Sequence, residues 1–371
     1  MPADPAGAAR VLAVNAGSSS VKVAVFGAGD PPRELARGKL ERAGAATAVL
    51  DALEAQGATA HLAGIGHRLV HGGPDHFAPA LVTPDLLRDL EKLKPLDPTH
   101  LPAELDLIAA FAARCPGVPQ VACFDTAFHQ NLPMVARTLP IPRRYQAQGV
   151  RRYGFHGISY EYLLEELARV AGADAARGRV VLAHLGSGAS LAAVHNGECV
   201  DTTMGFTPTG GLVMCTRTGD LDPGVLLHLM RTEKLTADQL DTLVNRESGL
   251  LGMSETSGDV RDLLAREAAD SRAAEAVAVF CYQARKWIGA MAAAVGGLDA
   301  LVFAGGIGEN APEVRARICA GLGFLGVRIA PARNAAGAAL ISEDGAAVAV
   351  RVIRTDEEAM IARTVLRLLN A

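Results

Sequence analysis

The sequence predicts an α/β protein built from two duplicated domains. The stretch Val11–Phe26 (VLAVNAGSSSVKVAVF) reads as an apolar strand, a Gly/Ser-rich turn and a second apolar strand. The stretch Arg179–Gly197 (RVVLAHLGSGASLAAVHNG) repeats this pattern in order and spacing. Two copies at a long period indicate a duplicated domain rather than a solenoid. The length of 371 residues also favours two domains.

The turn of the first copy carries groups that suit a phosphate. Asn15, Ser18, Ser20 and Lys22 offer an amide, two hydroxyls and a positive charge, and backbone N–H groups in such a turn can surround phosphate oxygens. An ordinary hairpin with a solvated turn explains this stretch equally well by itself. The second copy places His184 before Gly-Ser-Gly. Two such turns facing a shared cleft would hold a nucleotide's phosphate chain, so the pair favours the phosphate interpretation.

The composition excludes several classes of function. The net charge is −4 and basic residues do not cluster, which argues against a nucleic-acid partner. The longest apolar region, Trp287–Ile307, is interrupted by Gly296, Gly297 and Asp299, so we expect no membrane span. The N-terminus lacks the apolar core of a signal peptide, and the six cysteines form no CxxC pair. We therefore expect a cytoplasmic protein with reduced thiols.

The rest of the chain alternates strands with helices, as an α/β fold requires. Apolar runs predict the strands, and capped segments with periodic apolar residues predict the helices. The stretch between the first hairpin and Gly64 is polar and Ala-rich. In order, the main segments predicted outside the two hairpins are a strand over 65–73, helices over 83–93 and 103–114, a strand over 118–124, helices over 160–170, 224–231 and 236–246, a turn into a helix over 254–262, a helix over 272–296, a strand over 300–303, a glycine-rich junction over 304–310 before a helix that Pro312 opens, a strand over 348–353 and a closing helix over 359–369.

Charged side chains stand near the ends of several segments. Arg68 lies near the mouth of a predicted strand, where its planar fork suits a carboxylate or phosphate, although an exposed or paired charge is the commoner role. Asp125 ends another strand and is either a ligand contact or a helix N-cap. His156 is a structural histidine or a catalyst. Arg217 lies in the Gly/Thr-rich loop 201–223, which is a catalytic arm or a mobile surface loop.

Nine motifs, in this order, resemble those of the acetate kinase family, within the actin, sugar-kinase and Hsp70 fold. They are NAGSSSVK, GHRLVHGG, FDTAFH, YGFHG, HLGSGAS, TRTGDLDP, SGDVRDL, GGIGEN and TDEEAMIAR. The resemblance covers nearly the whole chain. It implies an actin-like ATPase fold with mixed β-sheets flanked by helices, an interdomain cleft and a homodimer. The first domain would span 1–127 with the C-terminal helix 357–371, and the second 128–356.

The resemblance implies reversible, magnesium-dependent transfer of the ATP γ-phosphoryl group to acetate, giving acetyl phosphate and ADP. Mn²⁺ is an alternative metal. An acceptor carboxylate is already ionised at pH 7, so direct in-line transfer needs no general base. It needs cations and hydrogen-bond donors that stabilise the transferring phosphoryl group. A propionate or other short-chain carboxylate kinase is the alternative, and a non-catalytic nucleotide-dependent sensor is a third hypothesis.

The resemblance also implies roles for individual residues. The implied catalytic residues are Arg68, Asp125, His156 and Arg217, with His156 and Arg217 as transition-state stabilisers. The implied acyl-site residues are Arg68, Val70, Thr99, Phe155 and Pro208. The implied nucleotide-binding residues are Lys22, His184, Gly186, Ser187, Gly188, Asp259, Val260, Arg261, Gly306, Ile307, Gly308 and Asn310. The implied metal ligands are Asn15 and Glu357, and His100 resembles a supporting histidine.

The chain departs from the family pattern at four single positions, in the segment Thr209-Gly210-Gly211, which replaces Leu-Glu-Gly, and in a shorter stretch before Gly64. Ser187 and Asp356 stand where the family usually has Asn, and Cys215 replaces a Gly near Arg217. Thr99 replaces the Leu that helps to line the pocket for the acyl methyl group. A change of one methylene is worth ~1–3 kcal/mol of discrimination, so the preferred chain length of the acid stays open.

Overall fold

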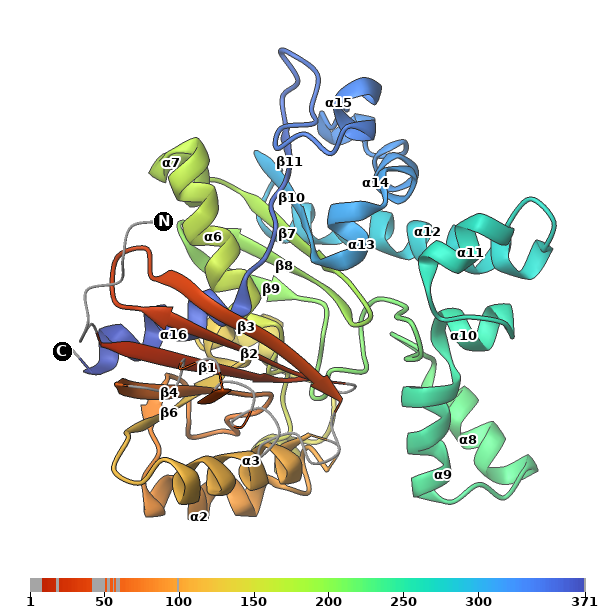
Figure 1. Cartoon of the computed structure of the whole chain (residues 1–371). Coiled ribbons are helices and arrows are strands. Elements are labelled where there is room, and N and C mark those ends of the chain that lie inside the picture. Colours follow the sequence, from red (N-terminus) through yellow and green to blue (C-terminus); the bar gives the residue numbers. More distant parts are fainter. Residues whose placement is uncertain are drawn as a thin grey trace. The chain divides into compact units, whose positions relative to one another are not determined.

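The computed structural model describes residues 9–17, 20–41, 51, 54–55, 57, 61–98 and 100–369. The chain forms two compact units, each with a mixed β-sheet and flanking helices, which confirms the predicted α/β class (Figure 1). Unit 1 comprises Met1–Gln130, Phe155–Tyr162 and Asp356–Ala371, and unit 2 comprises Asn131–Gly154 and Leu163–Thr355. The predicted second domain, 128–356, includes residues 128–130, Phe155–Tyr162 and Asp356, which this division places in unit 1.

Unit 1 contains a six-stranded sheet in the order β3-β2-β1-β4-β6-β5. Its strands are β1 (Arg10–Ala16), β2 (Ser20–Gly27), β3 (Arg33–Glu41), β4 (Leu62–Leu69), β5 (Ala80–Leu81) and β6 (Gln120–Phe124). β1 and β2 form the predicted antiparallel hairpin, while β1, β4 and β6 run parallel. Sequence analysis missed β3, because this edge strand carries mostly charged and small residues (RELARGKLE). Ser18 lies outside the described residues.

Alternation along β1 builds the core on both faces of this sheet. Val11 and Ala13 pack toward α16 (Glu357–Leu369), whereas Leu12 and Val14 pack with Phe111 of α3 (Leu101–Arg114). Figure 1 shows α16 on one face and α3, with α2 (Pro84–Leu93), on the other. Thr83 caps α2 as predicted, since its side chain accepts from the backbone of Leu86. The C-terminal helix is thus part of the unit 1 core.

Unit 2 repeats the strand order of unit 1. Its sheet follows β11-β10-β7-β8-β9, with β7 (Val180–Leu185), β8 (Ala189–His195), β9 (Glu198–Thr202), β10 (Ala300–Ala304) and β11 (Ala349–Val352). From the other edge, β9-β8-β7-β10-β11 matches β3-β2-β1-β4-β6 in order and in every strand direction. This correspondence confirms the predicted duplication.

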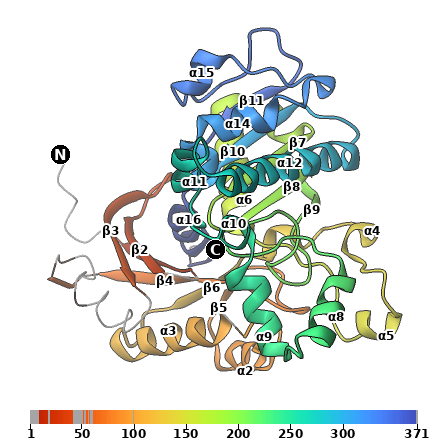
Figure 2. The ribbon, with the colours of Figure 1, turned by 90° about the vertical axis from the view of Figure 1, so that its right-hand side faces the viewer.

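Helices cover the sheet of unit 2. The longest, α12 (Ser271–Ala294), lies across β7, β8 and β9 and buries Val277, Phe280 and Ile288 (Figure 2). The other helices of this part are α4 (Met134–Arg137), α5 (Arg143–Gln146), α6 (Gly157–Ala171, which starts in unit 1), α7 (Ala173–Arg177), α8 (Pro223–Thr232), α9 (Ala237–Thr242), α10 (Gly249–Ser254), α11 (Val260–Arg266), α13 (Gly305–Asn310), α14 (Pro312–Cys319) and α15 (Pro331–Ala335).

Several predicted boundaries differ from the structure. The strand predicted over 65–73 begins at Leu62 and ends at Leu69, as β4. The helix predicted over 236–246 ends as α9 at Thr242 and continues as a π-helical segment, Leu243–Glu247. The glycine-rich junction after β10 is itself the short helix α13. α16 begins at Glu357, the start expected for the C-terminal helix 357–371, and the Asp356 side chain caps it by accepting from the backbone N–H of Ala359.

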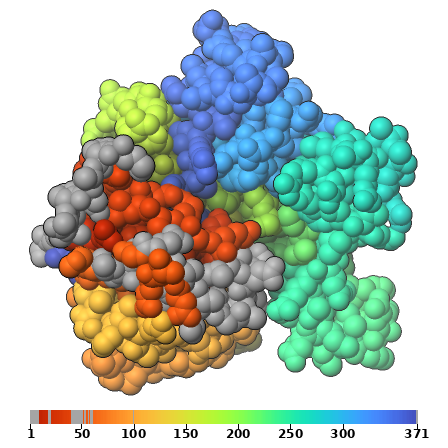
Figure 3. All heavy atoms as spheres, viewed as in Figure 1, coloured from red at the N-terminus to blue at the C-terminus, as the bar shows by residue number. Residues whose placement is uncertain are grey.

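Surface segments of unit 2 are joined by a buried arginine. In Figure 3 the blue segment that contains α15 lies against the lighter blue of α14. Arg315 of α14 is fully buried and donates to the side chain and carbonyl of Asn334 in α15, each at 2.8 Å. It also donates to the carbonyls of Gly308 and Glu309 in α13.

Nowhere in the described ranges is a helix both long enough and apolar enough to cross a bilayer.

The contact between β4 and α16 predicts a large effect at Gly66. A Cβ atom at this position would lie 2.3 Å from Cγ2 of Ile361 and 2.7 Å from Cγ2 of Val365. Both neighbours are β-branched and buried, so they cannot move aside freely. We expect Gly66→Ala to lower the free energy of unfolding by ~1–3 kcal/mol in urea titrations. Gly27→Ala is the control, since its Cβ meets Leu35 only at 3.6 Å; equal losses would contradict the prediction.

Candidate functional site

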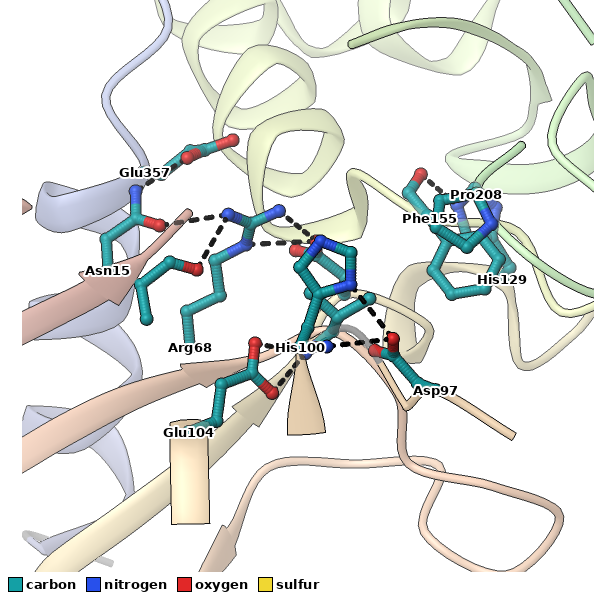
Figure 4. A network of polar contacts seen from close by, with 12 residues as sticks. Asn15, Arg68, Asp97, His100, Glu104, His129, Phe155, Pro208 and Glu357 are labelled. Atoms are coloured by element: carbon teal, nitrogen blue, oxygen red, sulfur yellow. Dashed lines mark hydrogen bonds and ion pairs between the residues drawn. The ribbon is translucent and has the colours of Figure 1, made fainter. Parts of the chain in front are cut away.

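Neighbouring parallel strands bring Arg68 and Asp125 together in unit 1. Arg68 lies at the end of β4 and Asp125 directly follows β6, so both stand at the carboxyl edge of the sheet. Nε and Nη2 of Arg68 donate to Oδ2 of Asp125 at 3.0 and 2.6 Å. Nη1 of Arg68 donates to Oδ1 of Asn15 at 3.1 Å. Figure 4 shows this guanidinium beside Asn15. The pair is largely buried, with 13% and 1% of the side chains exposed.

Burial and charge act in opposite directions on Asp125. Burial raises the pKa of its carboxyl group and the Arg68 guanidinium lowers it, but the net effect is a raised pKa. Burial by itself would lower the pKa of Arg68, yet the charges of Asp125 and Glu357 raise it. Oδ1 of Asp125 is buried, and it accepts no hydrogen bond from the residues that the structure describes. A buried acceptor of this kind points to a donor supplied by a ligand.

Asn15 links this ion pair to the start of α16. Its Nδ2 donates to Oε2 of Glu357 at 2.7 Å and to Oε1 of Glu358 at 2.6 Å. Glu358 is 3% exposed, and its other oxygen accepts from Nη1 of Arg37 in β3 at 2.5 Å. The amide therefore orients two carboxylates while its oxygen orients Arg68. Sequence analysis named Asn15 and Glu357 but missed Glu358 and Arg37.

The segment that carries His156 is anchored to the end of β6. His156 has a left-handed backbone (φ 59°) and directly precedes α6. The N–H of Gly157 donates to the carbonyl of Asp125 at 2.8 Å. A Cβ at Gly157 would lie 2.1 Å from that oxygen, so only glycine permits this approach. The carbonyl of Phe155 accepts from Nε2 of His129 at 3.0 Å. The structure thus brings Phe155 and His156 beside Asp125.

A second buried carboxyl group lies beneath Val70. Glu104 is 2% exposed and accepts from the backbone N–H of Val70 at 3.2 Å. Burial and the nearby Asp97 raise the pKa of Glu104 well above its ordinary value. Asp97 in turn accepts from the backbone and from Nδ1 of His100 (Figure 4). Sequence analysis named Val70 and His100 but missed Glu104, and Thr99 lies outside the described residues.

The same strand arrangement brings glycine-rich turns together in unit 2. His184 of β7 pairs with Ala304 of β10, so the segments after these parallel strands emerge side by side. A Cβ at Gly186 would lie 3.8 Å from the nitrogen of Gly306. Gly186 donates to the carbonyl of Gly188 at 2.9 Å and closes the hairpin turn. The predicted phosphate turn and the start of α13, with Ile307 and Gly308, therefore lie next to each other.

The long loop of unit 2 packs against this turn. The N–H of Cys215 donates to the carbonyl of Ser187 at 3.2 Å. Burial and the charge of Asp259 raise the pKa of the Cys215 thiol to about 11, against the effect of Arg217. Nη1 of Arg217 donates to the carbonyl of Pro208 at 3.1 Å. Cys215, Arg217 and Asp259 are therefore near one another.

The remaining predicted nucleotide residues lie at element ends or on the surface. Asp259 caps α11, which begins at Val260, and pairs at 2.6 Å with Arg261. Nδ2 of Asn310 donates to the carbonyl of Gly306 at 2.9 Å. Lys22, in unit 1, is exposed on β2 opposite Asn15.

The missed residues differ in whether the sequence could have revealed them. Glu358 follows Glu357 in TDEEAMIAR. Two adjacent carboxylates at the start of an apolar helix were a signal in the sequence that Glu358 could belong to the site. Glu104 occupies the first turn of a helix and reads as an ordinary favourable charge there. No pattern in the sequence pointed to Arg37, because the strand that carries it, β3, was not predicted.

Magnesium would need few protein ligands here. In the parts of the chain that the structure describes, no three His, Cys, Asp or Glu side chains are grouped to hold a metal ion. Mg²⁺ is usually held by one or two carboxylates together with water and phosphate oxygens. Glu357, oriented by Asn15 at 2.7 Å, offers hard oxygen ligands of this kind. Glu357 therefore fits as one ligand of a largely hydrated Mg²⁺.

Comparisons with known proteins agree on one family. Residues 38–363 match the sequence model of the acetokinase family. An acetate kinase of Rhodopseudomonas palustris is 50% identical over 309 residues, covering 83% of this chain and 77% of that protein. A propionate kinase of Citrobacter rodentium is 43% identical over 392 residues, covering 97% and 96%. The crystal structure of Porphyromonas gingivalis acetate kinase has a TM-score of 0.90 at 36% identity and covers 98% of this chain and 100% of that chain.

The Arg68–Asp125 pair predicts a pH-dependent loss of stability. The pKa of Asp125 in the folded protein is already raised, and it would rise further without the Arg68 guanidinium. Ionisation of Asp125 would then oppose folding more strongly, because the unfolded chain ionises at lower pH. We expect Arg68→Ala to lower the free energy of unfolding by ~3–5 kcal/mol near pH 7. The loss should shrink as the pH falls toward the unfolded-state pKa near ~4, where a neutral carboxyl tolerates burial.

Urea titrations at several pH values measure this effect. In an Asp125→Asn background, the loss of stability that Arg68→Ala causes should no longer depend on pH over this range. Arg88→Ala, which breaks an exposed ion pair with Asp85, should cost under ~1 kcal/mol. A loss for Arg68→Ala that grows as the pH falls would show that the interpretation is wrong.

Proposed function

The chain belongs to the acetokinase family, and from this membership we propose that it is an acetate kinase. It would transfer the γ-phosphoryl group of ATP reversibly to acetate, with acetyl phosphate and ADP as products. The observation that carries the proposal is the largely buried Arg68, held by Asp125 and Asn15 at the carboxyl edge of the sheet. A fixed guanidinium fork suits a planar carboxylate acceptor.

The acceptor's chemistry explains why cations dominate the assigned residues. Acetate is ionised at neutral pH and attacks phosphorus without losing a proton. The barrier comes from bringing an anion to a phosphate chain, and positive charge lowers it. We assign Arg68 to the acid's carboxylate and Arg217 and His156 to the phosphoryl group in transfer. Asp125, hydrogen-bonded to Arg68 through one oxygen, fixes the plane of the guanidinium.

Most of the residues assigned to the acyl group belong to unit 1, and most of those assigned to the nucleotide belong to unit 2. Val70, Phe155, Pro208 and Thr99 are proposed to contact the acyl chain. In unit 2, the proposed phosphate contacts are His184, Gly186, Ser187 and Gly188, with Lys22 of unit 1 on the phosphate side. The proposed adenosine and nucleotide contacts are Asp259, Val260, Arg261, Gly306, Ile307, Gly308 and Asn310. Helix N-termini and glycine turns present backbone N–H groups that favour phosphates.

Glu357 and Asn15 are the residues that we assign to Mg²⁺ or Mn²⁺. A bound divalent cation would neutralise charge on the nucleotide phosphates. Asn15 would hold the Glu357 carboxylate in place through its 2.7 Å hydrogen bond. We further propose that the protein is cytoplasmic, from its six scattered cysteines without a CxxC pair, and that it forms a homodimer, as the resemblance implies.

A propionate or longer-acid kinase is the second candidate. It is favoured by the similarity to the Citrobacter rodentium propionate kinase and by Thr99, which replaces the usual pocket leucine. The two candidates share every step of the chemistry and differ in the acyl pocket.

We expect hydroxamate to form fastest from acetate when ATP, Mg²⁺ and hydroxylamine are supplied with acetate, propionate or butyrate. The measured quantity is kcat/KM for each acid. A preference for propionate or butyrate would favour the second candidate. Nucleotide binding without hydroxamate from any acid would instead indicate a nucleotide-dependent sensor.

Removal of the Arg217 side chain, the second cation assigned to the chemistry, should mainly lower kcat. We expect Arg217→Ala to lower kcat by ~10²–10³-fold, because charge on the transferring group would lose one stabilising partner. Arg231→Ala, at an exposed position of α8 in the same unit, is the matched control and should keep wild-type kcat. A folded Arg217→Ala protein with wild-type turnover would remove this role.

A further inference from the structure

One carboxylate in unit 2 holds two segments that the proposed chemistry uses. Oε1 of Glu309, in α13, accepts from the backbone N–H of Gly305 at 2.9 Å. The same oxygen accepts from the backbone N–H of Thr355 at 3.1 Å. Glu309 thereby joins the start of α13 to the backbone that follows β11. Gly305 lies four residues before Glu309, and Thr355 lies 46 residues after it. Both bonds go to the side chain of Glu309, so neither belongs to the backbone ladder of a helix or sheet.

Each segment held by Glu309 leads directly to a proposed functional residue. Gly305 precedes Gly306, whose nitrogen lies beside the hairpin turn at Gly186. Thr355 lies two residues before Glu357, the assigned metal ligand. The intervening Asp356 caps α16, so little chain remains between Thr355 and the helix. A movement of the Thr355 backbone would therefore reach Glu357 through a short, ordered connection.

The negative charge of Glu309 by itself opposes nucleotide binding. A carboxylate close to a phosphate-binding segment repels the phosphates by Coulomb's law. A hydrogen bond to a charged acceptor is stronger than one to a neutral acceptor, and two backbone donors share this one. If positioning dominates, nucleotide affinity depends on the acceptor oxygen rather than on the charge.

We propose that Glu309 is a positioning residue that fixes Gly305 and Thr355, and through them the nucleotide-binding turn and the metal ligand. This inference rests on the proposed function. Glu309 itself contacts neither the substrate nor the metal in this proposal. Its amide analogue keeps an oxygen that can accept both N–H groups, which separates hydrogen bonding from charge.

Calorimetric titration of the full chain with ADP and Mn²⁺ tests the proposal without any turnover. We expect Glu309→Ala to weaken ADP binding about tenfold, because two charge-assisted hydrogen bonds are lost. Glu309→Gln should remain within about threefold of wild type. Glu313→Ala, an exposed carboxylate in the first turn of α14, is the matched control and should bind ADP as wild type does. In the hydroxamate assay, the KM for MgATP should rise more than kcat falls.

The possible outcomes separate this inference from the proposed function. A wild-type chain that makes hydroxamate while Glu309→Ala binds ADP normally would overturn the positioning role alone. Tighter ADP binding by both Glu309→Ala and Glu309→Gln would mean that charge repulsion dominates and would also overturn it. A wild-type chain that neither binds ADP nor forms hydroxamate would overturn the proposed function and, with it, this inference. Lower thermal stability of Glu309→Ala with unchanged ADP affinity would indicate a purely structural role.

Discussion

The site in unit 1 depends on the buried ion pair between Arg68 and Asp125. Taking both charges out of water is unfavourable, and the pair is retained only because its geometry and the added bond to Asn15 compensate. Removing either partner would leave a charge in a place that cannot solvate it. The pair also fixes Asn15, and Asn15 fixes two carboxylates of α16. One hydrogen-bond network therefore joins β1, β4, the residue that follows β6 and the start of α16.

Parallel strands explain why the candidate residues of each unit gather at the carboxyl edge of its sheet. In unit 1, adjacent parallel strands β4 and β6 place Arg68 and Asp125 at their carboxyl edge. In unit 2, adjacent parallel strands β7 and β10 place His184 and Gly306 at theirs. Parallel strands all end on the same edge, so residues distant in sequence meet there without long loops. The two units use this edge differently, with charged side chains in one and glycine backbone in the other.

Much of the fold followed from local patterns. Both hairpins, α2 with its Thr83 cap and α12 with its apolar stripe were predicted because each carries its signal within a few residues. β3 was missed because an edge strand with one solvated face can be rich in charge. α13 was read as a loop because glycine disfavours helices, and here tertiary contacts outweigh that propensity.

The sequence by itself determined the duplication, the family and the identity of most candidate residues, because motifs and their order are properties of the chain. Only the tertiary structure decided which of these residues act together. Asn15 meets Glu357 and Glu358 across more than 340 positions, and Glu309 meets Thr355 across 46. Such contacts depend on how strands and helices pack, and no local pattern encodes them. For the same reason the buried Glu104 emerged only once its hydrogen-bond partner, the backbone N–H of Val70, was in place.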